Sequence, residues 1–144
     1  MTRAAGWPPI GARVLAGLLA LGPAAAAAQA AAGDCAQALG GPAREVAGEG
    51  LVVAWRAVPH PLPLDRPVVL ELRVCGRPAD ALRVDADMPA HRHGMNYRPT
   101  VENLGNGRHL ARGLLFHMAG RWRLIFDIDT GGRRLRLTDE FELR

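Results

Sequence analysis

The chain has 144 residues, a formal net charge of +4 and two cysteines, and it contains neither serine nor lysine. Its length suits one domain. Because its 18 basic residues, all arginine, are scattered among 14 acids, there is no basic stripe of the kind that nucleic-acid binding requires. The lack of serine and lysine removes two common catalytic nucleophiles, so we expect a protein that is not an enzyme.

The N-terminal segment predicts a cleaved export signal over residues 1–30. Arg3 and Arg13 supply positive charge, residues 14–21 form a short apolar stretch, and residues 28–30 read Ala-Gln-Ala, a small-x-small cleavage site. Removing the two arginines lowers the net charge from +4 to about +2. We therefore expect a periplasmic or secreted protein.

A membrane anchor retained over residues 14–32 is the alternative to cleavage. Pro23 and the weakly apolar alanines of this segment argue against a stable span of about 20 residues. No other stretch is apolar enough to cross a bilayer, so we expect no transmembrane helix in the mature chain.

Residues 31–50 are rich in alanine and glycine and have no clear period. We expect an irregular N-terminal arm that carries the first cysteine. Cys35 and Cys75 are the only cysteines, and an even number in an oxidising compartment predicts one disulfide. That bridge would close a loop of about 40 residues.

From residue 51 onward, apolar and polar residues alternate with the period of β-strands. Short strands separated by turns every eight to twelve residues or so predict an immunoglobulin-like antiparallel β-sandwich over residues 51–144. Asp139 interrupts the alternation of the last strand, which suggests a bulge or a frayed edge. Seven strands are expected, at residues 51–56, 68–75, 82–88, 99–102, 108–117, 122–128 and 135–143.

The loop after the third expected strand carries candidate metal ligands. If the loop is extended, His91, His93 and Met95 project to one side, and Met88 can fold back towards them after Pro89. Thioether and imidazole ligands suit copper, with sulfur favouring Cu(I), whereas structural zinc prefers four Cys or His ligands. The alternative is a polar surface loop whose methionine packs on the core.

Strand directions decide which other histidines can meet this loop. Because consecutive antiparallel strands alternate in direction, the loop, the connection holding His60 and the turn at His117 and Met118 all lie at one end. Met118 fits a cap on the core and a metal ligand equally well, while His60 and His117 are less favoured. His109 begins the fifth strand at the opposite end, roughly 27 Å from His117, so we exclude it and expect an exposed strand histidine.

Two segments are similar to a known family. Residues 84–95 read Val-Asp-Ala-Asp-Met-Pro-Ala-His-Arg-His-Gly-Met, and residues 115–122, after Gly107, read Leu-Phe-His-Met-Ala-Gly-Arg-Trp. Across residues 51–129 the chain resembles the YtkA-like family of small exported domains, which is related to the periplasmic part of FixH-type proteins.

The resemblance implies an immunoglobulin-like sandwich, a cell-envelope location, and a role in copper handling or respiratory-oxidase maturation. It carries over Met88, His91, His93 and Met95 as ligand positions. With Met118 added from its place at the same end, these residues form the predicted copper site, and Cu(I) is the favoured ion.

The sequence therefore predicts an exported copper-binding protein, a chaperone or buffer, whose envelope partner is a copper acceptor or an oxidase-assembly protein. The alternative is a metal-free envelope adaptor that binds a partner protein through its loops or an exposed edge strand. A metal-dependent enzyme ranks last, because no base accompanies the sulfur-rich ligand set.

Overall fold

The computed structural model describes residues 34–144, so the predicted signal peptide lies outside the described residues. Within that part of the chain, no helix is long and apolar enough to span a bilayer. A single helical turn covers residues 34–37. The strands that follow it are β1 (Arg44–Gly48), β2 (Leu51–Val58), β3 (Pro67–Gly76), β4 (Ala81–Met88), β5 (His93–Gly94), β6 (Thr100–Gly105), β7 (Arg108–Leu115), β8 (Gly120–Thr130) and β9 (Arg133–Leu143).

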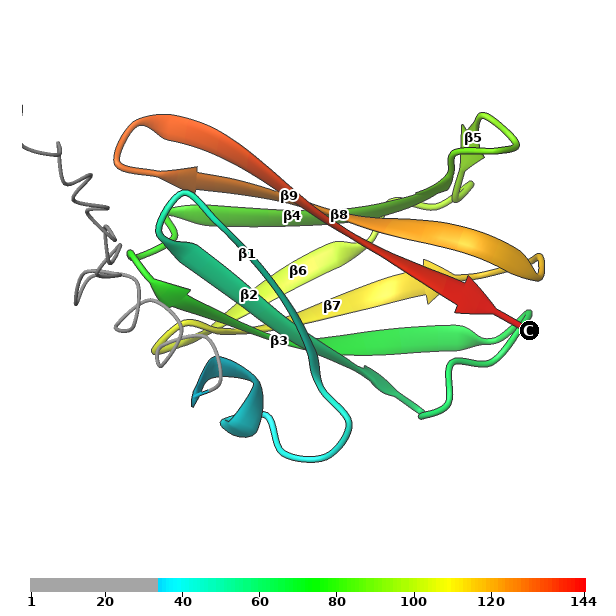
Figure 1. The fold of residues 1–144 in the computed structure, drawn as a ribbon, viewed down its shortest axis with the longest axis horizontal. Coiled ribbons are helices and arrows are strands. Elements are labelled where there is room, and N and C mark those ends of the chain that lie inside the picture. Colours follow the sequence, from blue (N-terminus) through cyan, green and yellow to red (C-terminus); the bar gives the residue numbers. More distant parts are fainter. Residues whose placement is uncertain (1–33) are drawn as a thin grey trace, which may run out of the picture.

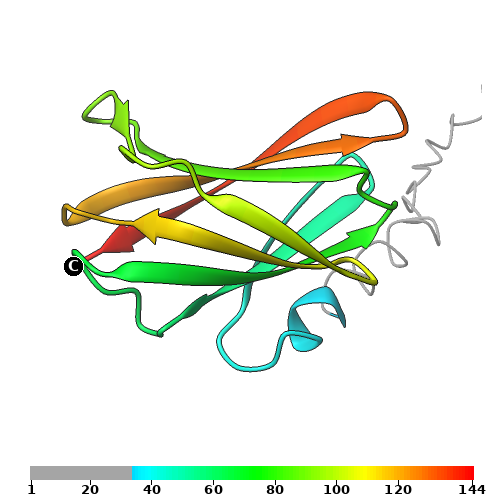
Figure 2. The same cartoon turned by 180° about the vertical axis from the view of Figure 1, so that it is seen from behind.

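The strands form two antiparallel sheets that pack face to face, which confirms the predicted β-sandwich. One sheet has the order β1-β2-β3-β7-β6 and the other β5-β4-β8-β9. Figure 1 shows the two layers, and Figure 2 shows β6 and β7 from behind. The seven expected strands correspond to β2, β3, β4, β6, β7, β8 and β9, and their inward side chains fill the core between the sheets.

The arm expected to be irregular contains a strand. Strand β1 pairs antiparallel with residues 51–55 of β2. The turn that joins the two strands holds Glu49 and Gly50, whose φ angles are 49° and 77°. Its sequence, Arg-Glu-Val-Ala-Gly, is mostly exposed or half-buried. It therefore lacks the apolar alternation by which a half-buried strand is found in sequence, and its pairing with β2 holds it in place.

The predicted disulfide between Cys35 and Cys75 is formed, with Cα atoms 6.0 Å apart. The buried Cys35 packs with Val52 and Ala54 on the outer face of β2, which explains why both faces of that strand are covered. Disulfides form and persist in oxidising compartments. The bridge therefore points to a periplasmic or extracellular protein.

A bulge in β7 overturns the expectation that His109 is exposed. Val68 pairs with Leu114 and Leu70 pairs with Ala111, so two residues of β7 lie opposite one residue of β3. Gly113, with a φ of 86°, lies in this bulge. Because an extra residue reverses the alternation of faces, His109 points inward and is 4% exposed.

Asp139 does not produce a bulge, because β9 pairs with β8 in unbroken register from Arg133 to Leu143. Its carboxylate accepts hydrogen bonds from Arg44 at 2.9 and 2.7 Å and from the Trp55 indole at 2.8 Å. A partly buried carboxylate is tolerated when it is paired in this way. The break in the sequence pattern therefore marks a polar contact between the two sheets.

Candidate functional site

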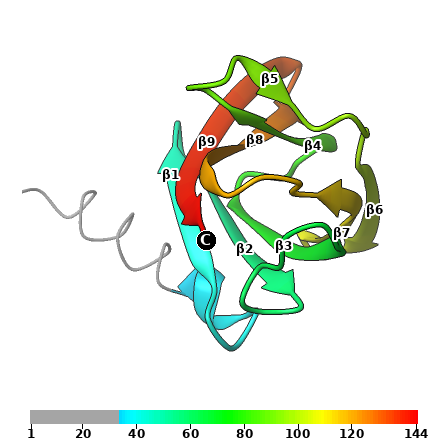
Figure 3. The same cartoon turned by 90° about the vertical axis from the view of Figure 1, so that its right-hand side faces the viewer.

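The candidate site lies at the end of the sandwich where β2, β4, β7 and β9 finish. This is the right-hand end in Figure 1, and Figure 3 looks onto it. Two segments carry its histidines: the hairpin formed by β4 and β5, and the connection from β7 to β8. The shared end predicted from strand directions is therefore observed.

The β4–β5 hairpin places His93 over the inner side of its sheet. His93 pairs with Met88 across the two strands, and directly opposed residues project to the same face. Since the Met88 side chain points into the core, His93 extends that inner face beyond the end of the sandwich. The turn is tight: the amides of His91 and Arg92 both donate to the Met88 carbonyl at 3.0 Å.

His117 reaches the same region from the β7–β8 connection. Its ring stands edge-on to Trp122, with ring centroids 5.7 Å apart and planes at 82°. The indole nitrogen of Trp122 donates to the Met118 carbonyl at 2.9 Å, and the Trp122 side chain is fully buried. A core residue thus fixes both the backbone beside His117 and one side of its imidazole.

Together His91, His93 and His117 form what we call the histidine cluster. The ring centroids of His91 and His93 are 5.8 Å apart, and those of His93 and His117 are 5.6 Å apart. Two imidazoles that share an ion through nitrogens about 2 Å from it have ring centroids roughly 4.5–6 Å apart. His117, a less favoured ligand in the sequence, therefore belongs with the loop histidines.

The histidine cluster is not a ready-made metal site. Among residues 34–144, no group of three or more His, Cys, Asp or Glu side chains is arranged to hold an ion. His91 and His93 are exposed and His117 is half-buried, so metal binding requires side chains to rotate until their nitrogens converge. Ordering a surface side chain costs roughly 0.5–1.5 kcal/mol, which is small beside the strength of metal coordination.

The three methionines predicted as ligands occupy different surroundings. Met88 is 0% exposed and belongs to the core, whereas Met118 is 36% exposed beside His117. Met118 is therefore no cap on the core. Met95 is half-buried against the core and lines a separate pocket that includes Leu82 and Tyr97. Coordination by these sulfurs stays a prediction.

The carboxylate of Asp87, the residue before Met88 in β4, is engaged in an ion pair. Asp87 forms a bidentate ion pair with Arg123 at 2.9 and 2.6 Å. Further along the same sheet, the hydrogen bond from Arg136 lowers the pKa of Asp127. Both carboxylates are therefore held by arginines on the outer face of the four-stranded sheet.

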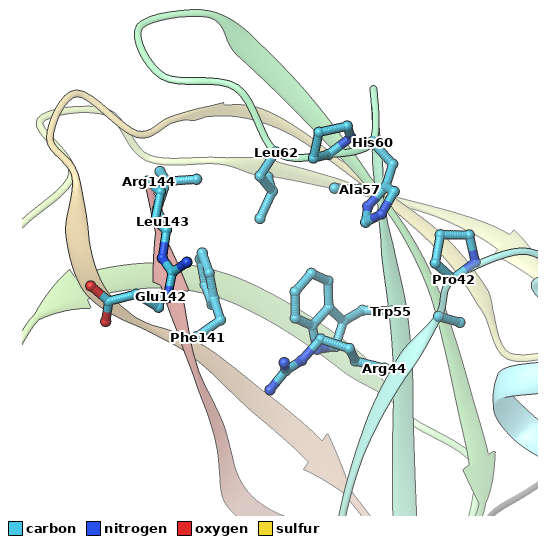
Figure 4. A pocket seen from close by; sticks show the side chains of 12 residues that line it. Pro42, Arg44, Trp55, Ala57, His60, Leu62, Phe141, Glu142, Leu143 and Arg144 are labelled. Carbon is cyan, nitrogen blue, oxygen red and sulfur yellow. The ribbon is translucent and has the colours of Figure 1, made fainter.

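An apolar pocket of about 450 Å³ opens at the same end, between β1, β2 and β9. Figure 4 shows Trp55 and Phe141 in its wall and His60 at its rim. The guanidinium of Arg44, which also lines the pocket, is held by Asp139. His60 therefore belongs to this pocket and lies outside the histidine cluster.

Comparisons with known proteins leave the family open. No family model matches the chain, and no curated protein matches it. A solved structure with a related shape is FetP of uropathogenic E. coli strain F11, recombinantly expressed in the periplasm of E. coli; the two are 12% identical, with a TM-score of 0.45, and the match covers 69% of this chain and 91% of FetP. The fold and the site define a disulfide-bridged β-sandwich protein with histidines gathered at one end.

Proposed function

We propose that this chain is an exported copper-binding protein that acts as a chaperone or buffer. The observation that carries the proposal is the histidine cluster, in which His93 of the hairpin contacts both His91 and, from the β7–β8 connection, His117. Met118 lies beside it at the surface. Imidazole with thioether is a ligand set suited to copper.

The chemistry of the neighbourhood supports copper over a structural zinc ion. Both cysteines are in the disulfide, so the described chain has no free thiol. Structural zinc sites are built mainly from cysteine thiolates combined with histidine. Histidine-rich sites accept copper more tightly than other divalent first-row ions, following the Irving–Williams order.

The surface position of the cluster supports a role in transfer or storage. Exposed ligands on a short hairpin are accessible to a second protein, which can replace them one at a time. We propose a copper acceptor or an oxidase-assembly protein of the cell envelope as that partner, in line with the resemblance to YtkA-like domains. Within this proposal the chain is a binding protein, and we propose no enzymatic activity for it.

Competitive Cu(I) titration of the protein recovered from the periplasm tests the proposal. The wild type is compared with a His91→Ala/His93→Ala/Met95→Ala variant, and His60→Ala serves as a matched control for an exposed histidine at the same end. We expect the triple variant to lose affinity and the control to keep it. Equal affinity of the triple variant and the wild type would overturn the assignment.

A metal-free adaptor is the second candidate, and the free edge of the larger sheet favours it. Among the described strands, β6 pairs with β7 alone, and Leu104 on this edge is exposed. An exposed edge strand can accept a strand from another protein. Recovery of the same envelope partner by the wild type and by the triple variant, with no copper in either, would support this function instead.

A further inference from the structure

The histidine cluster also bears on the oxidation state of the bound ion, an inference that rests on the proposed function. We propose that the protein holds copper as Cu(II), through the imidazole nitrogens of His91, His93 and His117. In this arrangement the ion joins the β4–β5 hairpin to the β7–β8 connection. His117 is the third ligand, and no methionine coordinates the ion.

His117 is the best-supported of the three side chains. Trp122 packs against one side of its ring and fixes the neighbouring backbone through the hydrogen bond to Met118. Its other neighbour is His93, whose ring lies at 27° to its own. A ligand held from one side by a buried residue loses little freedom when it binds an ion, because its position is set in advance.

The nitrogen-rich surroundings favour Cu(II) over Cu(I). Cu(I) is bound best by soft sulfur ligands, whereas imidazoles accept Cu(II) readily. The thioether of Met88 is sealed in the core, and that of Met95 packs against the core and lines another pocket. Of the predicted sulfur ligands, Met118 alone is exposed near the cluster, so imidazole nitrogens outnumber accessible sulfurs.

Copper bound by these three histidines would hold the β4–β5 hairpin against the β7–β8 connection. Strand β5 has two residues and pairs with β4 alone among the described strands. An ion shared with His117 connects this short strand to the segment that links the two sheets. A ligand that binds only the folded state raises its stability, so Cu(II) is expected to raise the melting temperature and to protect residues 89–98 from proteolysis.

The test is a Cu(II) titration of the full chain followed by electron paramagnetic resonance. For the wild type we expect one Cu(II) per chain with nitrogen coordination and a raised melting temperature. For His117→Ala we expect affinity to fall at least about tenfold, the spectrum to change, and the proteolytic protection to be lost. His60→Ala is the control and should match the wild type in all three measurements.

The outcomes separate this inference from the proposed function. If the wild type binds Cu(I) but not Cu(II), copper binding stands and the three-imidazole Cu(II) site is wrong. If His117→Ala binds Cu(II) with unchanged affinity and spectrum, the inference is also wrong. If neither ion binds the wild type, both proposals fall together.

Discussion

The two ends of the sandwich use histidine in opposite ways. At one end, which also holds the disulfide, His109 is buried and its Nδ1 lies 3.2 Å from the Gly107 carbonyl. At the other end, His91 and His93 are exposed on a hairpin and meet His117 on the following connection. The first histidine is part of the packing, and the other three are available to a ligand.

The difference shows that the position of a histidine relative to the strands decides whether its ring is buried or exposed. Burial lowers the pKa of His109 below its usual 6.5, because desolvation disfavours the charged ring, and the hydrogen bond with Gly107 opposes that shift. A buried, neutral ring with a backbone partner is a structural element. By contrast, His91 and His93 are exposed and His117 is half-buried against Trp122. The nearest backbone partner of His93 is the Gly94 carbonyl, 3.4 Å from its Nδ1.

Removing the disulfide tests how far a covalent bond stabilises the end of the sandwich that holds His109. We expect it to have the largest effect on the free energy of unfolding. The bridge joins residues 40 positions apart, so Cys35→Ala/Cys75→Ala should lower the free energy of unfolding by about 4 kcal/mol in the chain-entropy model. Urea denaturation measures the change, and the wild type under reducing conditions is the control. An unchanged midpoint would show that packing alone holds that end.

Substitution of Met88, which pairs with His93 across the hairpin, tests whether this side chain stabilises the fold or binds the metal. Because its side chain is fully buried, Met88→Ala should destabilise the fold by about 2–5 kcal/mol. Met88→Leu conserves volume and should cost less than about 1.5 kcal/mol. Copper titration of the leucine variant then isolates the sulfur: unchanged affinity is expected, and a large loss would make Met88 a ligand.

Gly120 tests the connection that carries His117. Its φ is 127°, and a Cβ added there would lie 3.0 Å from the Met88 methyl carbon. Gly120→Ala should therefore cost about 1–3 kcal/mol and weaken copper binding by moving the connection. Gly131→Ala is the matched control, because its φ is also positive but nothing lies within 4 Å of the added Cβ. Equal stability and affinity of the two variants would argue against crowding.

The pH dependence of the free energy of unfolding tests the same contrast, and we expect this effect to be the smallest of the four. With a folded-state pKa below 6.5, His109 binds fewer protons in the folded chain than in the unfolded chain. The stability that the neutral His109 ring contributes to the folded state is present above pH 6.5 and is lost as the pH falls towards the folded-state pKa. Urea denaturation at several pH values should show this loss in the wild type and His60→Ala, and less of it in His109→Asn. Identical profiles would contradict the assignment.

Local sequence patterns were sufficient for much of this fold. The period of two located all seven expected strands, and the even number of cysteines predicted the bridge between Cys35 and Cys75. Strand directions then placed the candidate loop, His117 and Met118 at one end. These inferences succeed because side-chain alternation and the reversal of antiparallel strands depend on the chain alone.

Other features depend on partners that are distant in sequence. Strand β1 has no apolar period and is held by its pairing with β2. The exposure predicted for His109 was wrong because the bulge at Gly113 is defined only against β3. Asp139 broke the pattern of its strand, and the reason lay in Arg44 and Trp55 on the other sheet.

The candidate site divides in the same way. The sequence determined which imidazoles and thioethers the chain offers and at which end of the sandwich they lie. Only the tertiary structure decided that Met88 is sealed in the core and that His117, held by Trp122, meets His93. The physical reason is that periodicity fixes the face of a residue along its own strand, whereas contact between side chains requires two separate segments to pack against one another.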